Sequence, residues 1–381
     1  MTARDSILAP AGRRRYSGIT LLELLVVMGI LALIATLGVA SYIAMSQTAK
    51  EEEYAARIET MLRQARNSAL GSNTFAYVEI DTENRRITPW ATHTVAMWHF
   101  EDCDDYGKTT GARHNAILRG ARQVKNGKIG KGVHMGPGGY VDAGDDPDFD
   151  LDEGGYLEAY IKPDPDEFSG DNYIFSKEGA YALRIGTKGL LIGEIAGNGK
   201  TKGVRVYSKT YRVVPNRWTK VALAWDRNVT RVMADDLVLA TGPGAMPPVV
   251  SAGLRVGHDS QSFAGVIDEV RILSAVSGGT LELPKTFTLT HNATPWNAVY
   301  FAGDGTLDIR FHAGPIEIAV ESDRRVRAID IDMFGNTKRL EVERKEKPQE
   351  EVDPAETKRR EADLKKRIKF VGGGGQKVSH P

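Results

Sequence analysis

The sequence RRRYSGITLLELLVVMGILALIATLGVA, at positions 13–40, decides the fold class of this chain. From Leu24 to Ala40 it carries no charged side chain, and its only hydroxyl group belongs to Thr36. Extended to residues 21–44, the segment would run about 36 Å as a helix at ~1.5 Å per residue. That length is enough to cross the ~30 Å hydrocarbon layer of a bilayer. The segment therefore predicts a transmembrane helix near the N-terminus.

The residues around this segment indicate its orientation. Arg4 and the arginines at 13–15 precede it, against a single acid, Asp5. The positive-inside rule places the N-terminus in the cytoplasm and everything after Lys50 outside. A secretory signal would combine a shorter apolar run with a small-x-small cleavage site. This run is long, and Glu23 interrupts it near its start.

Glu23 is the unusual residue of the segment. A carboxylate in a membrane helix costs ~2.5 kcal/mol or more at the centre and less at the edge. A helix dipole also tolerates an acid near the N-terminus of a helix. Taken alone, Glu23 is therefore either an interfacial acid or a functional group.

The order of residues around Glu23 resembles the leader of a type IV prepilin. A basic leader is followed by Gly18, Ile19, Thr-Leu-Leu-Glu23 and an uncharged stretch. The resemblance implies that a prepilin peptidase cuts after Gly18 and that the new amine on Ile19 is N-methylated. The usual first mature residue is phenylalanine, so Ile19 departs from the family pattern. Glu23 of one subunit would face the amine of another and fix the register of the filament, because either charge is costly when left unpaired in an apolar core.

The helix continues beyond the apolar segment. Over residues 50–69, apolar side chains recur at intervals of 3, 4, 3 and 4 residues, which predicts one buried helical face. These side chains belong to Ala55, Ile58, Leu62, Ala65 and Ala69. Gly71 predicts the end of the helix. The resemblance to pilins implies that this half packs on a small sheet, and the alternative is a short coiled-coil stalk.

Short alternating segments predict a sheet that is interrupted and later resumed. The expected strands lie at 75–81, 86–90, 285–291, 296–301, 307–311, 316–320 and 325–330. The run Phe301-Ala-Gly-Asp-Gly305 and the strands after it resemble the C-terminal half of H-type minor pseudopilins of type II secretion. We therefore expect an α+β pilin fold with a leader at 1–18, a helix at 19–71 and a discontinuous β domain at 72–92 and 285–342. The charged residues 343–381 are predicted to be disordered.

The middle of the chain predicts a second domain. Many short apolar runs separated by glycines indicate an all-β sandwich. Segments at 140–141, 157–163, 216–222 and 263–272 resemble the laminin-G-like, concanavalin-type jelly roll. The resemblance covers residues 95–275 and implies that the first and last strands lie side by side, as an insertion into a host hairpin requires. We expect this segment to fold on its own, because a sandwich of ~180 residues buries ample apolar surface.

Catalytic motifs are missing from the sequence, so we expect no enzyme. The histidines are scattered, and a single cysteine, Cys103, rules out an internal disulfide. The glycine-rich run 197–203 lacks the spacing of a phosphate-binding loop and predicts a hairpin turn. The acidic run 145–152 lacks the EF-hand offsets and predicts a solvated loop.

Calcium is the one cofactor that the sequence suggests. Asp268 on the last strand of the jelly roll and Glu101 or Asp102 on the first would be neighbours, and calcium accepts such oxygen ligands. The alternative is that Asp268 hydrogen-bonds backbone groups at the end of a strand.

The aromatic residues of the middle domain divide into two groups. Trp98, Trp218 and Trp225 are expected in the core. Tyr207, Tyr211 and Phe263 are candidates for stacking on sugar rings.

The charge balance narrows the function. Lys plus Arg and Asp plus Glu both number 50, and this neutrality argues against charge-driven binding to nucleic acid. We expect a structural subunit of a type II secretion pseudopilus or type IV pilus-like filament, anchored in the bacterial inner membrane with its bulk in the periplasm. Its expected partners are prepilin peptidase, other pilins or pseudopilins, and a carbohydrate or secreted protein bound by the jelly roll. The alternatives are a membrane-anchored binding module and a glycosidase, which would need paired carboxylates at a fixed separation.

Overall fold

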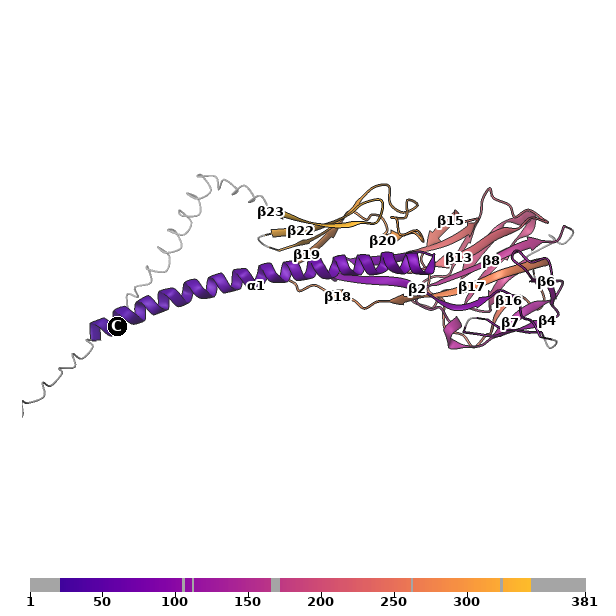
Figure 1. Cartoon of the computed structure of the whole chain (residues 1–381), viewed down its shortest axis with the longest axis horizontal. Helices are drawn as coiled ribbons and strands as arrows, with labels where there is room; N and C mark the ends of the chain where they lie inside the picture. The colour runs from indigo at the N-terminus through magenta and orange to yellow at the C-terminus, as the bar shows by residue number, and fades with distance from the viewer. Residues whose placement is uncertain are drawn as a thin grey trace, which may run out of the picture.

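The computed structural model describes residues 21–343, apart from 105–106, 112, 166–171, 262 and 323–324. Gly18, Ile19, the leader and the tail beyond 343 lie outside the described residues, as does the side chain of Glu23. Figure 1 shows a long helix, α1, with strands packed along its C-terminal half and a larger group of strands beyond its end. We call residues 95–275 the head and the other described residues the body.

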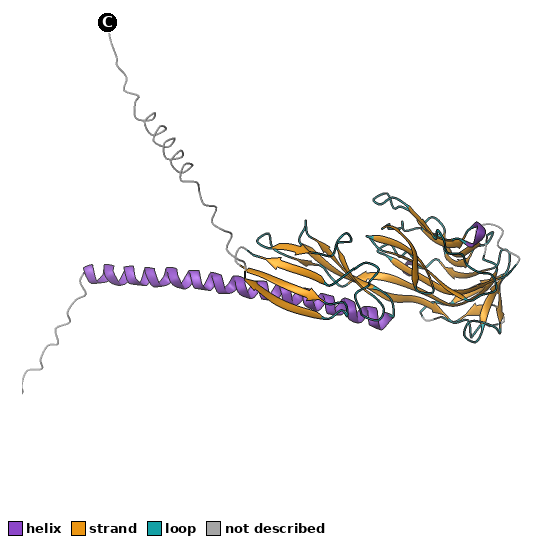
Figure 2. Ribbon diagram, turned by 90° about the horizontal axis from the view of Figure 1, so that it is seen from above, coloured by secondary structure: helices purple, strands orange, loops and turns teal. Residues whose placement is uncertain are grey.

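The body consists of α1 and short antiparallel strands. Its elements are α1 (Leu21–Ser72), β1 (Ala76–Asp81), β2 (Arg86–Trp98), β18 (Leu281–Glu282), β19 (Thr288–His291), β20 (Ala298–Phe301), β21 (Ile316–Glu321), β22 (Arg325–Ile331) and β23 (Thr337–Glu343). Sheet β19-β21-β22-β23 and the pair β1–β2 both contact α1. In Figure 2 the C-terminal half of α1 lies among these strands, whereas its N-terminal half extends away from them.

The predicted buried face of α1 is confirmed. Ala55, Ile58, Leu62, Ala65 and Ala69 are all buried, and they share one core with residues of β1, β21 and β22. The helix ends at Ser72, one residue after the glycine that predicted its end. By contrast, the large apolar side chains of residues 21–34 are all more than half exposed. A helix with the length and apolarity needed to span a membrane is not found among the described residues.

The head is a two-sheet sandwich, which confirms the predicted all-β fold. Its elements are β3 (Lys108–Thr109), β4 (Ala116–Arg119), β5 (Arg122–Val124), β6 (Gly132–Met135), β7 (Tyr140–Gly144), η1 (Pro147–Phe149), β8 (Gly155–Pro163), β9 (Asn172–Lys177), β10 (Tyr181–Ile185), η2 (Thr187–Gly189), β11 (Leu191–Ile195), β12 (Val204–Tyr207), β13 (Thr219–Trp225), β14 (Val229–Ala234), β15 (Leu237–Pro243), β16 (Leu254–Gly257) and β17 (Gly265–Ser277). One sheet has the order β12-β11-β10-β9-β16-β7-β4-β3. The other contains β15-β14-β13-β8-β17. Trp98 and Trp225 are fully buried in the core, as predicted, and Trp218 is half-buried.

Two long strands run through both head and body. β2 pairs with β1 over Arg86–Trp90 and with β17 over Trp90–Trp98. The first and last strands of the head are therefore neighbours, as the resemblance implies. Because β2 begins in the body and β17 ends there, the expected limits at 95 and 275 fall inside strands. Head and body share one continuous sheet, β15-β14-β13-β8-β17-β2-β1-β20.

A third core joins the head to the body. Rings of the body stack in series, with centroids 5.1 Å apart for Tyr77–Tyr300 and 4.4 Å apart for Tyr300–Phe311. They belong to one buried cluster with apolar residues of the head. The head residues of that cluster are Tyr156, Ala222, Ala224, Val229, Met233, Leu273 and Ala275. The head thus depends on the body to cover part of its outer face.

A buried ion pair lies in this junction. Arg231 Nη2 is 2.7 Å from Asp226 Oδ2, and both side chains are almost fully buried. The hydroxyl group of Tyr300 donates to Asp226 at 3.2 Å, and the guanidinium lies 4.1 Å from the ring centre of Phe75. Desolvation raises the pKa of Asp226, although Arg231 lowers it in part.

One predicted strand is wrong. Residues 307–311 form a turn in which Phe311 N and His312 N donate to the carbonyl oxygen of Asp308 at 2.9 and 3.0 Å. The Asp308 carboxylate also binds the guanidinium of Arg310. The alternation of apolar residues did not reveal these local bonds. β23 was not predicted as a strand, because its charged sequence resembles the start of the tail.

His312 should make the stability of the body depend on pH. Its Nε2 accepts the backbone N–H of Tyr300 at 2.8 Å, and burial lowers its pKa to about 4. A histidine with a depressed folded pKa stabilises the protein fully above its unfolded pKa of ~6.5, and this contribution is lost as the pH falls toward 4. The loss should approach roughly 3 kcal/mol. Denaturant unfolding at a series of pH values measures it, and His312→Gln should remove this part of the slope. An unchanged slope in the variant would contradict the assignment.

Candidate functional site

The head carries an open groove of about 500 Å³. It lies on the sheet β12-β11-β10-β9-β16-β7-β4-β3, which does not continue into the body. We call it the head groove. Strands β9, β10, β11 and β12 form its floor and walls, and His258 closes one side. Its lining residues are Tyr173, Ser176, Lys177, Glu178, Gly179, Ala180, Tyr181, Ala182, Glu194, Ile195, Ala196, Gly203, Val204, Arg205 and His258. This volume is within the usual range for small-ligand sites.

The groove combines aromatic rings with charged groups. The rings of Tyr173 and His258 lie 5.0 Å apart, and the Arg184 guanidinium lies 5.9 Å from the centre of the Tyr173 ring. Glu194 Oε1 accepts from Arg184 at 3.0 Å and from Arg205 at 2.7 Å. Rings that offer an apolar face, next to fixed donors and acceptors, suit a ligand with an apolar face and a polar rim, as sugars have.

A buried lysine supports the floor of the groove. The side chain of Lys177 is fully buried, and its ammonium group donates to the carbonyl oxygen of Ala252 at 2.8 Å. The carboxylate of Asp150 lies 3.2 Å from the same nitrogen. These contacts hold the end of β9 in place beneath the groove.

The predicted calcium ligands support a turn. Asp268 Oδ2 accepts the backbone N–H groups of Lys128 and Ile129 at 2.7 and 2.9 Å, and its Oδ1 accepts that of Glu269 at 2.8 Å. Glu101 Oε1 accepts the N–H of Lys131 at 2.9 Å. Both carboxylates therefore accept backbone N–H groups of the same turn. For Asp268, this bonding to the backbone is the alternative to calcium that the sequence left open.

The three predicted calcium ligands are not gathered around one point in the structure. Asp102 is exposed, and Glu101, Asp102 and Asp268 do not gather their oxygens into one set of ligands. Burial raises the pKa of Asp268, while its three N–H donors lower it. Calcium at these residues stays a prediction and would have to compete with backbone amides.

Asp268→Ala tests both roles of the carboxylate. The variant leaves three backbone N–H groups without their acceptor, so the free energy of unfolding should fall by about 1–3 kcal/mol. We expect the same fall in calcium and in chelator, measured by thermal melting. A rise in melting temperature with calcium that the variant lacks would instead support a metal at this turn.

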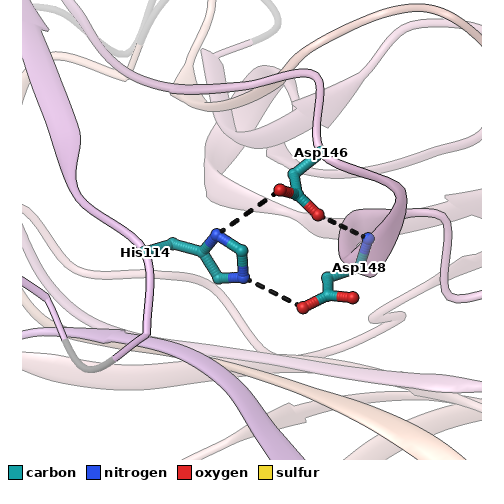
Figure 3. A group of neighbouring side chains, drawn as sticks. All are labelled: His114, Asp146 and Asp148. Atoms are coloured by element: carbon teal, nitrogen blue, oxygen red, sulfur yellow. Dashed lines mark hydrogen bonds and ion pairs between the residues drawn. The ribbon is translucent and has the colours of Figure 1, made fainter.

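A different group of side chains comes together in the acidic loop. Figure 3 shows the His114 ring facing both Asp146 and Asp148, one at each ring nitrogen. His114 Nε2 lies 3.1 Å from Asp148 Oδ2, and Nδ1 lies 3.9 Å from Asp146 Oδ2. Asp146 also caps η1 by accepting the N–H of Asp148 at 3.0 Å. Two carboxylates and an imidazole are a mixed donor set that transition metals accept, and in the described structure they form ion pairs and a helix cap.

Sequence spacing could not reveal this group. The acidic run was predicted as a solvated loop, and His114 precedes Asp146 by 32 residues. Only the fold, through the bond from Trp98 Nε1 to the carbonyl oxygen of His114 at 2.8 Å, holds this histidine near the loop.

The candidate aromatic residues have different environments. Tyr207 is 50% exposed on β12 and Tyr211 is half-buried, whereas Phe263 is 1% exposed and belongs to the core. Tyr173 lines the groove and was not among the candidates for stacking on sugar rings. Its ring could not be placed from the sequence because alternation does not say which sheet face is open.

A larger groove lies on the body. It measures about 810 Å³ and separates α1, near Ala65 and Ser68, from Trp90 on β2 and Val276 on β17. It is distinct from the head groove and leaves this flank of the helix open.

Two family models match the chain. The prokaryotic N-terminal methylation motif matches residues 13–39, and the concanavalin A-like lectin/glucanases superfamily matches residues 135–278. Both matches lie where the sequence resemblances were found. A search of curated proteins finds no significant match.

Several solved structures are similar to parts of this chain. Domain 4 of AbnA, a GH43 extracellular arabinanase from Geobacillus stearothermophilus solved with arabinotriose, is 17% identical, with 48% of this chain and 93% of that chain covered and a TM-score of 0.39. The Ruminococcus gnavus IT-sialidase CBM40 bound to α2,3-sialyllactose is 16% identical, with 37% and 88% covered and a TM-score of 0.32. The binding domain of botulinum neurotoxin serotype D is 10% identical, with 62% and 74% covered and a TM-score of 0.37.

Proposed function

Because the chain joins a prokaryotic N-terminal methylation motif to a concanavalin A-like domain, we propose that it is a prepilin-like filament subunit that displays the head. The motif is the observation that carries this proposal. A peptidase would cut after Gly18, and Ile19 would become the methylated first residue. The filament would be a type II secretion pseudopilus or a type IV pilus-like fibre, reached from the inner membrane.

The division of α1 into two halves supports this role. Residues 55–69 bury a single apolar face against the body, and residues 21–34 expose apolar side chains on all sides. An exposed helix of that kind needs either lipid or other helices as its surroundings. Before assembly the membrane would surround these side chains with lipid. After assembly the helices of other subunits would surround them in the filament.

The N-terminus of the mature protein tests the proposal. In the native bacterium, the chain should begin with N-methyl-Ile19, and Gly18→Ala should leave the leader in place. Mass spectrometry of the N-terminal peptide measures this outcome. Gly29→Ala is the matched control, because a Cβ there would meet no atom within 4 Å, and its leader should be removed normally. An intact Met1 in the wild-type protein, or a cut inside the apolar run, would contradict the proposal.

We also propose that the head binds a carbohydrate in the head groove and does not act as an enzyme. The adjacent rings of Tyr173 and His258 and the fixed Glu194 carboxylate support this assignment. Tyr173→Ala should weaken binding to a glycan array at least tenfold. Tyr140→Ala, on another strand of the same sheet, is the control and should bind as the wild type does. Release of reducing sugar from a bound glycan would contradict the non-catalytic role.

A further inference from the structure

Positive charge is concentrated in one segment of the head. Residues 184–217 contain eight Lys and Arg residues and a single acid, Glu194, in a chain that is neutral overall. The basic residues are Arg184, Lys188, Lys200, Lys202, Arg205, Lys209, Arg212 and Arg217. All of them except Arg184 are exposed.

The fold gathers most of these cations at one sheet edge. β10, β11 and β12 are the last three strands of their sheet, with β12 outermost. Lys188 lies in the β10–β11 turn, and Lys200 and Lys202 lie in the β11–β12 hairpin, at the other end of the strands. Arg205 is on β12, and Lys209 and Arg212 follow that strand. We call these six residues the basic edge.

Few carboxylates neutralise the positive charges of the basic edge. Arg205 pairs with Glu194 across the β11–β12 register. Among the described residues, the other five cations form no ion pair with a carboxylate. Their charge is therefore available to a ligand.

The basic edge adjoins the head groove. Arg205 belongs to both, and its chain neighbours Gly203 and Val204 also line the groove. Tyr207, two residues after Arg205 on the same strand, points to the same face and is 50% exposed. On the opposite side the groove is limited by Lys177, whose ammonium is already bound by Asp150. The cationic surface is thus a strip on one flank of the groove.

We infer that the head groove and the basic edge together bind an acidic polysaccharide, whose sugar rings carry carboxylate or sulfate groups. The inference rests on the proposed carbohydrate role of the head and names the class of glycan. A neutral glycan would leave the exposed cations unused, and a small anion would leave the rings of Tyr173 and Tyr207 unused. A narrow strip beside a groove fits one flexible chain, and the carboxylates of Asp145 and Asp150, which lie against Lys177 on the other side of the groove, would repel a polyanion wide enough to reach them.

Matched acidic and neutral glycans test the inference on the full-length chain in nonionic detergent. Polygalacturonate is compared with its methyl ester, dextran sulfate with dextran, and a double-stranded DNA fragment is the third arm. We expect both acidic polymers to bind at least tenfold more tightly than their neutral counterparts. Added salt should weaken binding of the acidic polymers, because it screens exposed charges.

A pair of charge variants locates the site. Lys200→Gln with Lys202→Gln should weaken binding of the acidic polymers about tenfold and reduce the salt dependence. Lys125→Gln with Lys285→Gln makes the same change in net charge at exposed positions outside the basic edge and should bind as the wild type does.

Three outcomes would overturn the inference. They are equal affinity for acidic and neutral glycans, tighter binding of DNA than of either acidic polymer, and wild-type affinity in the Lys200/Lys202 variant. If neutral glycans bind and Tyr173→Ala abolishes that binding, the carbohydrate role stands and only the acidic class is lost. If no glycan binds, the carbohydrate role fails as well, while the N-terminal cleavage still tests the filament role separately.

Discussion

Arg231→Met is expected to lower the free energy of unfolding by about 3–5 kcal/mol. The substitution leaves the Asp226 carboxylate buried between head and body without its cation. It also removes the guanidinium that lies against Phe75, Phe311 and Tyr300. Denaturant unfolding of the full chain measures the loss. Because head and body share this junction, both should unfold at the same lowered denaturant concentration.

Two further measurements separate the lost charge pair from lost packing. Arg231 lowers the pKa of Asp226, so in its absence that pKa should rise further above its ordinary value. An acid with a raised folded pKa destabilises the protein progressively as the pH rises from its unfolded pKa of ~3.9 to the folded value, so the variant should regain stability in acid. The double variant Arg231→Met with Asp226→Asn should recover much of the loss at neutral pH. A double variant no better than Arg231→Met would show that packing, and not the unpaired charge, causes the effect.

The head expressed alone as residues 95–275 is expected to be less stable than in the full chain by roughly 5 kcal/mol or more. Removing the body takes away the β2 residues that pair with Leu273 and Ala275, and it uncovers Tyr156 and Met233. Each large apolar side chain exposed in this way costs ~1.5–3 kcal/mol at full exposure. The sequence-based expectation of an autonomous head stays a prediction, and this comparison tests it. Thermal melting and binding of a hydrophobic dye report the difference.

A repaired fragment serves as the control for this prediction. Extending it to residues 86–277 restores the β2–β17 ladder, and Met233→Lys with Leu273→Thr removes exposed apolar surface. Together these changes should recover a soluble fragment with a cooperative transition. If the unrepaired fragment 95–275 melts as the full chain does, the shared core contributes little and the head is autonomous after all.

Periodicity was enough to predict the buried face of α1 and the sandwich of the head. Apolar spacing placed Ile58 and Leu62 in the core, and the short apolar runs between glycines indicated the strands of the sandwich. Both signals are local, because each depends only on which residues alternate along one element.

Long-range features could not be predicted in the same way. The sequence predicted a strand that ended at Trp90, whereas β2 continues to Trp98 because β17 pairs with it from Trp90 to Trp98. The junction core, the group around His114 and the head groove each combine residues that are far apart in the chain. The charge of residues 184–217 was visible in the sequence, but only the order of β10, β11 and β12 shows that it forms one edge.

The passage of β2 and β17 through the boundary of the head has a mechanical consequence. A domain tethered by one flexible linker can swivel, whereas two neighbouring strands joined by a hydrogen-bonded ladder resist both twisting and bending. A pull on a ligand held by the head would pass into the body along two covalent backbones at once and load the ladder in shear. Every copy in a filament would then present its head at the same angle to α1, so that tension and orientation are transmitted together from the bound surface to the fibre axis.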